Sequence, residues 1–141
     1  MWKLVHNWVW RLTNQIKVDF FRQKLILDSD DLQLRNKRFI LAVLEEVRSW
    51  PNREELEIVS NQLLRSCTAV GANYRAARRA RSKLEFYSKL CIVVEEIDEC
   101  NYWLDLSQTI LPHSETLNQI LDESDQLTRI YSSIRKSTKE K

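Results

Sequence analysis

The chain has very few of the residues that make tight turns, since its 141 residues include one glycine and two prolines, where average usage would give about ten and about seven. Sheets and phosphate-binding loops depend on glycine and proline to turn the backbone. These counts exclude an all-β fold, a dinucleotide-binding fold and a glycine-rich phosphate loop. With 43% hydrophobic and 30% charged residues the chain can still bury a core, so composition predicts one all-α domain with short loops.

Residues that commonly bind metals are also scarce. The two histidines, His6 and His113, lie far apart in the sequence and pair with no cysteine. The three cysteines, Cys67, Cys91 and Cys100, fall inside apolar helical stripes at spacings that do not suit a metal site. We expect buried, reduced thiols, which are typical of a cytoplasmic protein.

The acidic residues in the third quarter of the chain do not form a recognisable catalytic site. Di-iron helical bundles require Glu-x-x-His pairs on two helices. Here four acids lie close together with no histidine among them: Glu95, Glu96, Asp98 and Glu99. Carboxylate-pair hydrolysis also needs a cleft, and the expected short loops provide none. We therefore expect no metal, no cofactor and no enzymatic activity.

No apolar run approaches the roughly 18 residues that span a bilayer, and no secretory signal is indicated. Residues 1–27 form a separate amphipathic segment with five basic and one acidic side chain and three tryptophans. Such a segment can pack on its own domain or on a second subunit, lie on a membrane surface, or remain a loosely ordered extension. We favour packing, and a membrane partner is not expected.

Helix start and stop signals divide the rest of the chain. The acidic cluster of residues 28–31 suits the beginning of a first helix, which should stop at Trp50 because a proline follows it. Asn52 can cap a second helix that runs to about Arg79.

Two further helices have clearer starts. Ser82 and Glu85 have the spacing of a capping box, in which the hydroxyl bonds the Glu amide and the carboxylate reaches back to the cap amide. This third helix should end before Pro112, and Ser114 can cap the last one. Short turns make consecutive helices antiparallel neighbours.

The sequence therefore predicts an antiparallel up-down-up-down four-helix bundle over residues 28–137. The amphipathic extension, residues 1–27, precedes it and a polar tail, residues 138–141, follows it. The expected core stripe of the second helix is Leu56, Val59, Leu63, Cys67, Val70, Tyr74 and Ala77. That of the last helix is Leu117, Ile120, Leu127, Ile130 and Ile134.

Gly71, the only glycine, falls in the middle of the second helix, where it costs about 1 kcal/mol relative to alanine. This position indicates close approach by another backbone or by a ligand. We favour helix packing within the bundle or between subunits. The candidate packing or interface residues are Gly71, Ala72, Asn73, Tyr74 and Trp103. Tyr102 and Trp103 are interpreted as core or interface anchors rather than as stacking platforms for bases.

Charge is strongly segregated along the chain. Residues 65–89 carry seven basic side chains and one acidic one, whereas residues 90–111 carry five acidic and no basic ones. The basic block can bind phosphates, or it can pair with Glu95, Glu96 and Glu99 across the turn. We expect Arg65 and Arg75 to pair internally. The candidate nucleic-acid-binding residues are Arg75, Arg78, Arg79, Arg81, Lys83 and Lys89.

Three blocks of sequence carry a family resemblance. They are LLRSCTAVGANYRAA (residues 63–77), ARSKLEF (80–86) and EEIDECNYWLDL (95–106). In this order they resemble the four-helix-bundle proteins of the bacterial 23S rRNA intervening-sequence family. The resemblance implies an antiparallel bundle and a homopentamer. Together with the basic block it favours a nucleic-acid partner, with RNA expected rather than DNA. An adaptor that assembles as a ring and binds a protein is the alternative.

Overall fold

The structure is a computed structural model that describes residues 31–139. Residues from Arg35 onward form one compact unit; of the unit before it, Met1–Leu34, the structure describes residues 31–34, which are helical. The amphipathic extension predicted for residues 1–27 lies outside the described residues.

The described residues form helices joined by short connections, and they contain no strand, which confirms the all-α prediction. A helix covers residues 31–48. It is followed by α2 (Glu54–Arg78), α3 (Lys83–Ile110) and α4 (Glu115–Lys139). The last helix thus runs two residues into the segment expected as a polar tail.

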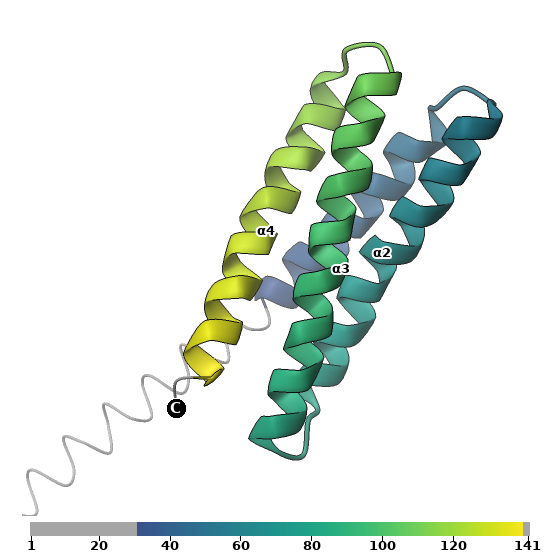
Figure 1. Ribbon diagram of the computed structural model, residues 1–141. Coiled ribbons are helices and arrows are strands. Elements are labelled where there is room, and N and C mark those ends of the chain that lie inside the picture. Colours follow the sequence, from purple (N-terminus) through teal and green to yellow (C-terminus); the bar gives the residue numbers. More distant parts are fainter. Residues whose placement is uncertain (1–30, 140–141) are drawn as a thin grey trace, which may run out of the picture. The chain divides into compact units, whose positions relative to one another are not determined.

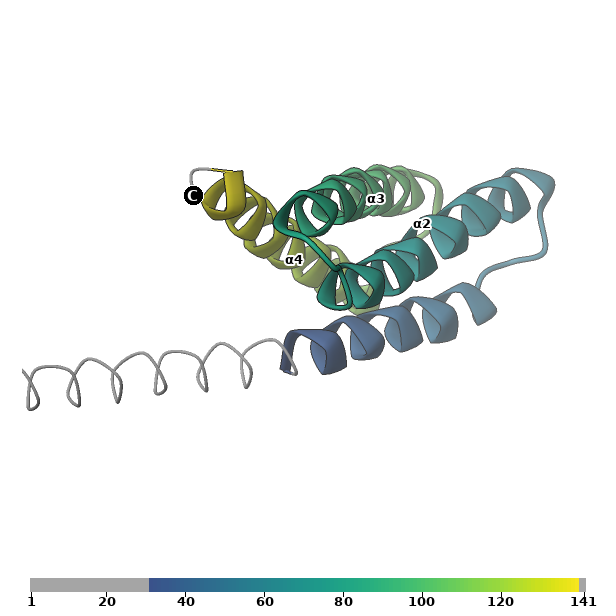
Figure 2. The same cartoon turned by 90° about the horizontal axis from the view of Figure 1, so that it is seen from below.

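Consecutive helices run in opposite directions (Figure 1). Helix α3 packs against both α2 and α4, and Figure 2 shows residues 35–48 of the first helix lying along α2. The α2–α3 turn and the C-terminal end of α4 are at the same end of the bundle, and the α3–α4 turn is at the other. The helix contacts and directions agree with the predicted up-down-up-down arrangement.

The helix starts agree with the capping residues at α3 and α4. The Glu85 amide donates to Ser82 Oγ at 3.0 Å, and the Leu117 amide donates to Ser114 Oγ at 3.1 Å. The reciprocal capping-box bond differs from the prediction, because the Glu85 carboxylate accepts from the Arg81 amide at 2.9 Å instead of from the cap amide.

The predicted start of α2 was wrong. Its N-cap residue is Arg53, in an extended conformation and without a side-chain cap bond, so Asn52 does not cap the helix. Three acids in the first turn, Glu54, Glu55 and Glu57, place negative charge near the unpaired amides of that end, which supports the start without a cap.

The core follows the α2 stripe, whose seven predicted residues are all buried. In α4 the prediction was partly wrong, because Ser124 and Tyr131 are buried and Ile130 and Ile134 are only half-buried. The buried positions 117, 120, 124, 127 and 131 alternate steps of three and four, so the step that follows Leu127 is four and leads to Tyr131, not to Ile130. Periodicity therefore outweighs hydrophobicity at this position.

Gly71 lies where the 31–48 helix packs closely against α2. A Cβ atom added there would lie 2.8 Å from Ile40 Cδ1 and 3.6 Å from Asn36 Nδ2. Gly71 itself is half-buried, and its φ angle is not positive. The glycine is therefore explained by packing within the bundle and not by backbone conformation.

Candidate nucleic-acid interface

The predicted basic residues gather around the end of α2, the α2–α3 turn and the first turns of α3. Five of the six are exposed, and Lys89 is half-buried. We call this set the basic surface: Arg75, Arg78, Arg79, Arg81, Lys83 and Lys89. It is built on two helices and a four-residue connection, so the backbone that carries the charges is rigid.

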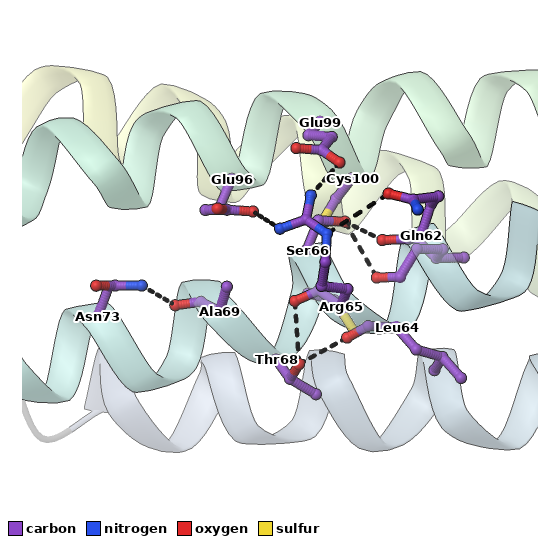
Figure 3. A network of polar contacts seen from close by, with 12 residues as sticks. Gln62, Leu64, Arg65, Ser66, Thr68, Ala69, Asn73, Glu96, Glu99 and Cys100 are labelled. Atoms are coloured by element: carbon purple, nitrogen blue, oxygen red, sulfur yellow. Dashed lines mark hydrogen bonds and ion pairs between the residues drawn. The ribbon is translucent and has the colours of Figure 1, made fainter.

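Two of the three α3 acids expected to pair with this surface, Glu96 and Glu99, are engaged elsewhere, whereas Glu95 is exposed and forms no ion pair among the described residues. Arg65 forms ion pairs with Glu96, at 3.4 Å, and with Glu99, as Figure 3 shows. Trp103 Nε1 also donates to Glu99 Oε1 at 3.1 Å. The hydrogen bond from Arg65 lowers the pKa of Glu99, and the hydrogen bond from Trp103 lowers it further. The hydrogen bond to Glu99 in turn raises the pKa of Arg65. The predicted pairing of Arg65 is therefore confirmed.

Three arginines of the basic surface, Arg75, Arg79 and Arg81, have little compensating charge. Arg81 lies 3.9 Å from Glu85, but its side chain is 93% exposed, and pairs of this kind contribute roughly 0–1 kcal/mol. Within residues 31–139, Arg75 and Arg79 form no ion pair. The internal pairing expected for Arg75 is therefore wrong, because Arg65 lies nearer the middle of α3 and takes both carboxylates.

A polar contact beneath Arg65 ties α2 to α3. Ser66 is fully buried, and its Oγ donates to the Gln62 carbonyl at 3.0 Å while it lies 3.4 Å from Cys100 Sγ (Figure 3). This contact was not predicted from the sequence. The step of three from Leu63 to Ser66 was the available signal.

The candidate packing residues of α2 differ in how deeply their side chains are buried. Tyr74 is a core residue, 4% exposed, whose ring meets that of Tyr131 edge-on at 5.2 Å between centroids. Asn73 is half-buried and donates from Nδ2 to the Ala69 carbonyl at 2.9 Å. Ala72 is exposed, so its role at an interface stays a prediction.

On α3 the two neighbouring aromatic rings have different environments. Trp103 is half-buried and bonded to Glu99, whereas Tyr102 is 59% exposed. Their rings meet edge-on at 4.8 Å between centroids. Trp103 fits the anchor interpretation, while Tyr102 is an exposed apolar surface away from the basic residues.

The thiols are only partly as expected. Cys67 and Cys100 are buried, but Cys91 is half-buried. Burial raises the pKa of Cys67 to about 12 and raises that of Cys100 as well, so neither is a nucleophile near neutral pH.

Within the described residues no group of three His, Cys, Asp or Glu side chains could hold a metal ion. No helix of this part of the chain is long and apolar enough to cross a bilayer.

Comparison with known proteins gives one family and one fold. The sequence model of the family described as 23S rRNA-intervening sequence protein matches residues 31–133. A crystal structure of a protein of unknown function from the S23 ribosomal protein family, from Bacteroides thetaiotaomicron, is similar with a TM-score of 0.68 and 29% sequence identity. The similarity covers 74% of this chain and 98% of that one. No curated protein matches the chain.

Proposed function

The chain belongs to the 23S rRNA-intervening sequence protein family, and from this premise we propose that it is a non-enzymatic RNA-binding protein of the cytoplasm. The basic surface would hold the phosphates of a structured RNA. Guanidinium groups suit this partner because they bind phosphate oxygens through two parallel hydrogen bonds. No motif that reads base edges is visible in the sequence, so binding would be led by charge and shape.

One observation supports the proposal above the others. Glu96 and Glu99, two of the three α3 acids expected to pair with the basic block, are occupied by Arg65. Arg75 and Arg79 are exposed and form no ion pair among the described residues. An exposed, concentrated positive charge on a rigid support is the usual electrostatic footprint of a nucleic-acid-binding protein.

The test is a titration of a fluorescently labelled RNA hairpin with the protein at low salt, followed by anisotropy. Arg75→Glu combined with Arg79→Glu should weaken binding about tenfold or more, because two phosphate contacts become repulsive. The matched control is Arg48→Glu with Arg53→Glu, which makes the same charge change at the opposite end and should leave affinity within about twofold. Absence of binding by the wild-type protein, or equal binding by both variants, would discard the proposal.

We also propose that the chain assembles as a homo-oligomer, with a pentamer favoured by the family resemblance. Large apolar side chains are exposed on three different helices, at Leu41 (55%), Ile58 (58%) and Tyr102 (59%), and such side chains are commonly covered in assemblies. Light scattering measures the mass directly. A particle of 16.9 kDa at working concentration contradicts assembly.

The alternative function is that of an adaptor whose assembly binds another protein and no RNA. The same exposed apolar residues favour it, since they provide contact area that a polyanion does not need. Purification from the native cell separates the two functions. Bound nucleic acid supports the first, and a stoichiometric protein free of nucleic acid supports the second.

A further inference from the structure

The C-terminal end of α4, which lies at the same end of the bundle as the α2–α3 turn (Figure 1), is also basic. Helices α2 and α4 run in the same direction (Figure 1) and are held in register by the edge-on contact of Tyr74 with Tyr131. Arg78 follows Tyr74 by four residues, and Arg135 follows Tyr131 by four. Because one helical turn advances about 5.4 Å, both arginines lie one turn further toward the same end of the bundle.

The end of α4 is basic throughout. Residues 129–139 include four basic and no acidic side chains. They are Arg129, Lys136 and Lys139, which are exposed, and Arg135, which is half-buried. Within the described part of the chain these four form no ion pair. Together with the basic surface they make up what we call the basic end.

The rest of α3 and α4 has the opposite charge. Residues 90–128 contain nine acidic side chains and no lysine or arginine. This stretch runs from the middle of α3 through the α3–α4 turn, which lies at the far end of the bundle from the α2–α3 turn (Figure 1). Antiparallel packing therefore converts charge segregation along the sequence into positive charge at one end and negative charge toward the other.

Helix dipoles explain only part of this pattern. Basic residues near a helix C-terminus are favourable, and the last turns of α2 and α4 contain two each: Arg75 and Arg78, and Lys136 and Lys139. The turn and the start of α3 lie beyond this effect. Arg81 and Lys83 stand at the N-terminal side of α3, where the dipole disfavours positive charge, so the dipole does not account for them.

We propose that the whole basic end, contributed by α2, α3 and α4 together, contacts RNA, and that it takes the phosphate backbone of a double helix. This rests on the function proposed above and extends it to α4 and to one class of RNA. Single-strand binders add aromatic side chains on which bases stack. Among the described residues the one aromatic side chain that is mostly exposed is Tyr102, which lies in the acidic stretch. Duplex RNA is recognised through phosphates and shape, which this surface can provide.

The experiment measures binding of the full chain to an RNA duplex and to an unstructured single strand of equal length. The informative variant is Lys136→Glu with Lys139→Glu, because both side chains are exposed. It should weaken duplex binding about tenfold, comparably with Arg75→Glu/Arg79→Glu. The control at the far end, Arg48→Glu/Arg53→Glu, should change it less than about twofold. If circular dichroism shows that the α4 variant loses helix, Lys136→Gln with Lys139→Gln replaces it, with an expected loss of about threefold.

The outcomes separate this inference from the proposed function. If the α2 variant loses affinity and folded α4 variants bind like wild type, the basic surface stands and its extension to α4 is overturned. Tighter binding of the single strand than of the duplex overturns the duplex assignment. If the wild-type protein binds neither RNA, the proposed function fails and this inference fails with it. Loss of duplex binding in both the α2 and the α4 variants, with the control unaffected, is the expected result.

Discussion

The contact between Gly71 and Ile40 gives a prediction whose size follows from the structure. Gly71→Ala should gain about 1 kcal/mol from helix propensity. The new Cβ would lie 2.8 Å from Ile40 Cδ1, whereas carbon atoms pack best at about 3.5–4.0 Å. The isoleucine methyl must therefore move by roughly 1 Å, at a cost of about 0.5–1.5 kcal/mol if the side chain leaves its rotamer. We expect the single variant to remain within about 1 kcal/mol of wild type.

Ile40→Val removes the atom that the new Cβ would meet. Alone it should destabilise the protein by about 0.5–1.5 kcal/mol. Combined with Gly71→Ala, the added methyl occupies the space that Cδ1 leaves, and the propensity gain is no longer offset. The two changes should therefore couple favourably by about 0.5–1.5 kcal/mol.

Urea unfolding followed by circular dichroism at 222 nm measures all four members of this cycle. The matched control is Ala72→Gly on the exposed face of α2, which should cost about 1 kcal/mol and be additive with Ile40→Val. A coupling near zero between Gly71→Ala and Ile40→Val would refute the explanation of the glycine by close packing.

Three further predictions concern the caps, the thiols and the Arg65 network. Ser82→Ala should lower the free energy of unfolding by about 1 kcal/mol in urea, because the Glu85 amide loses its acceptor. A thiol reagent should label only Cys91 in the folded protein and all three cysteines in denaturant; labelling that persists in Cys91→Ser would contradict the burial of the other two. Since Arg65 lowers the pKa of Glu99 from 4.5, their pairing stabilises the protein above that pH and is lost as pH falls through the lowered pKa. Arg65→Met should therefore reduce Tm more near neutral pH than near pH 2, and an equal reduction at both would count against the pair.

Much of the fold could be predicted from periodicity and capping residues. The α2 stripe was predicted correctly because its apolar residues keep one helical face throughout. The caps Ser82 and Ser114 were predicted correctly because a serine hydroxyl just before a helix accepts a hydrogen bond from an amide of the first turn. The buried polar residues were missed because the predicted stripes included only apolar side chains. Asn36 and Ser66 are at most 2% exposed, and Ser66 lies three residues after Leu63, so its spacing was the signal that could have indicated burial.

The interface was predicted less completely than the fold. The basic block of residues 65–89 is local in sequence and was recognised. Which arginine takes the α3 acids depends on the register between α2 and α3, and this register placed Arg65, not Arg75, beside Glu99. The basic end of α4 was missed because residues 112–141 have five acidic and five basic side chains and so no net charge. Four of the acids precede residue 129 and all the basic residues lie from 129 onward, and the bundle shows that the basic part lies beside the end of α2 (Figure 1).

The central claim, that the basic end binds the phosphate backbone of RNA, is tested most directly by the salt dependence of duplex binding. Each phosphate contact releases counterions, so the slope of log Kobs against log salt counts contacts. With ten basic side chains at this end, about half of them engaged, we expect a slope of roughly −4 or steeper, reduced by about 2 in Arg75→Glu/Arg79→Glu. A slope near zero, or one that is unchanged in this variant, would contradict the account.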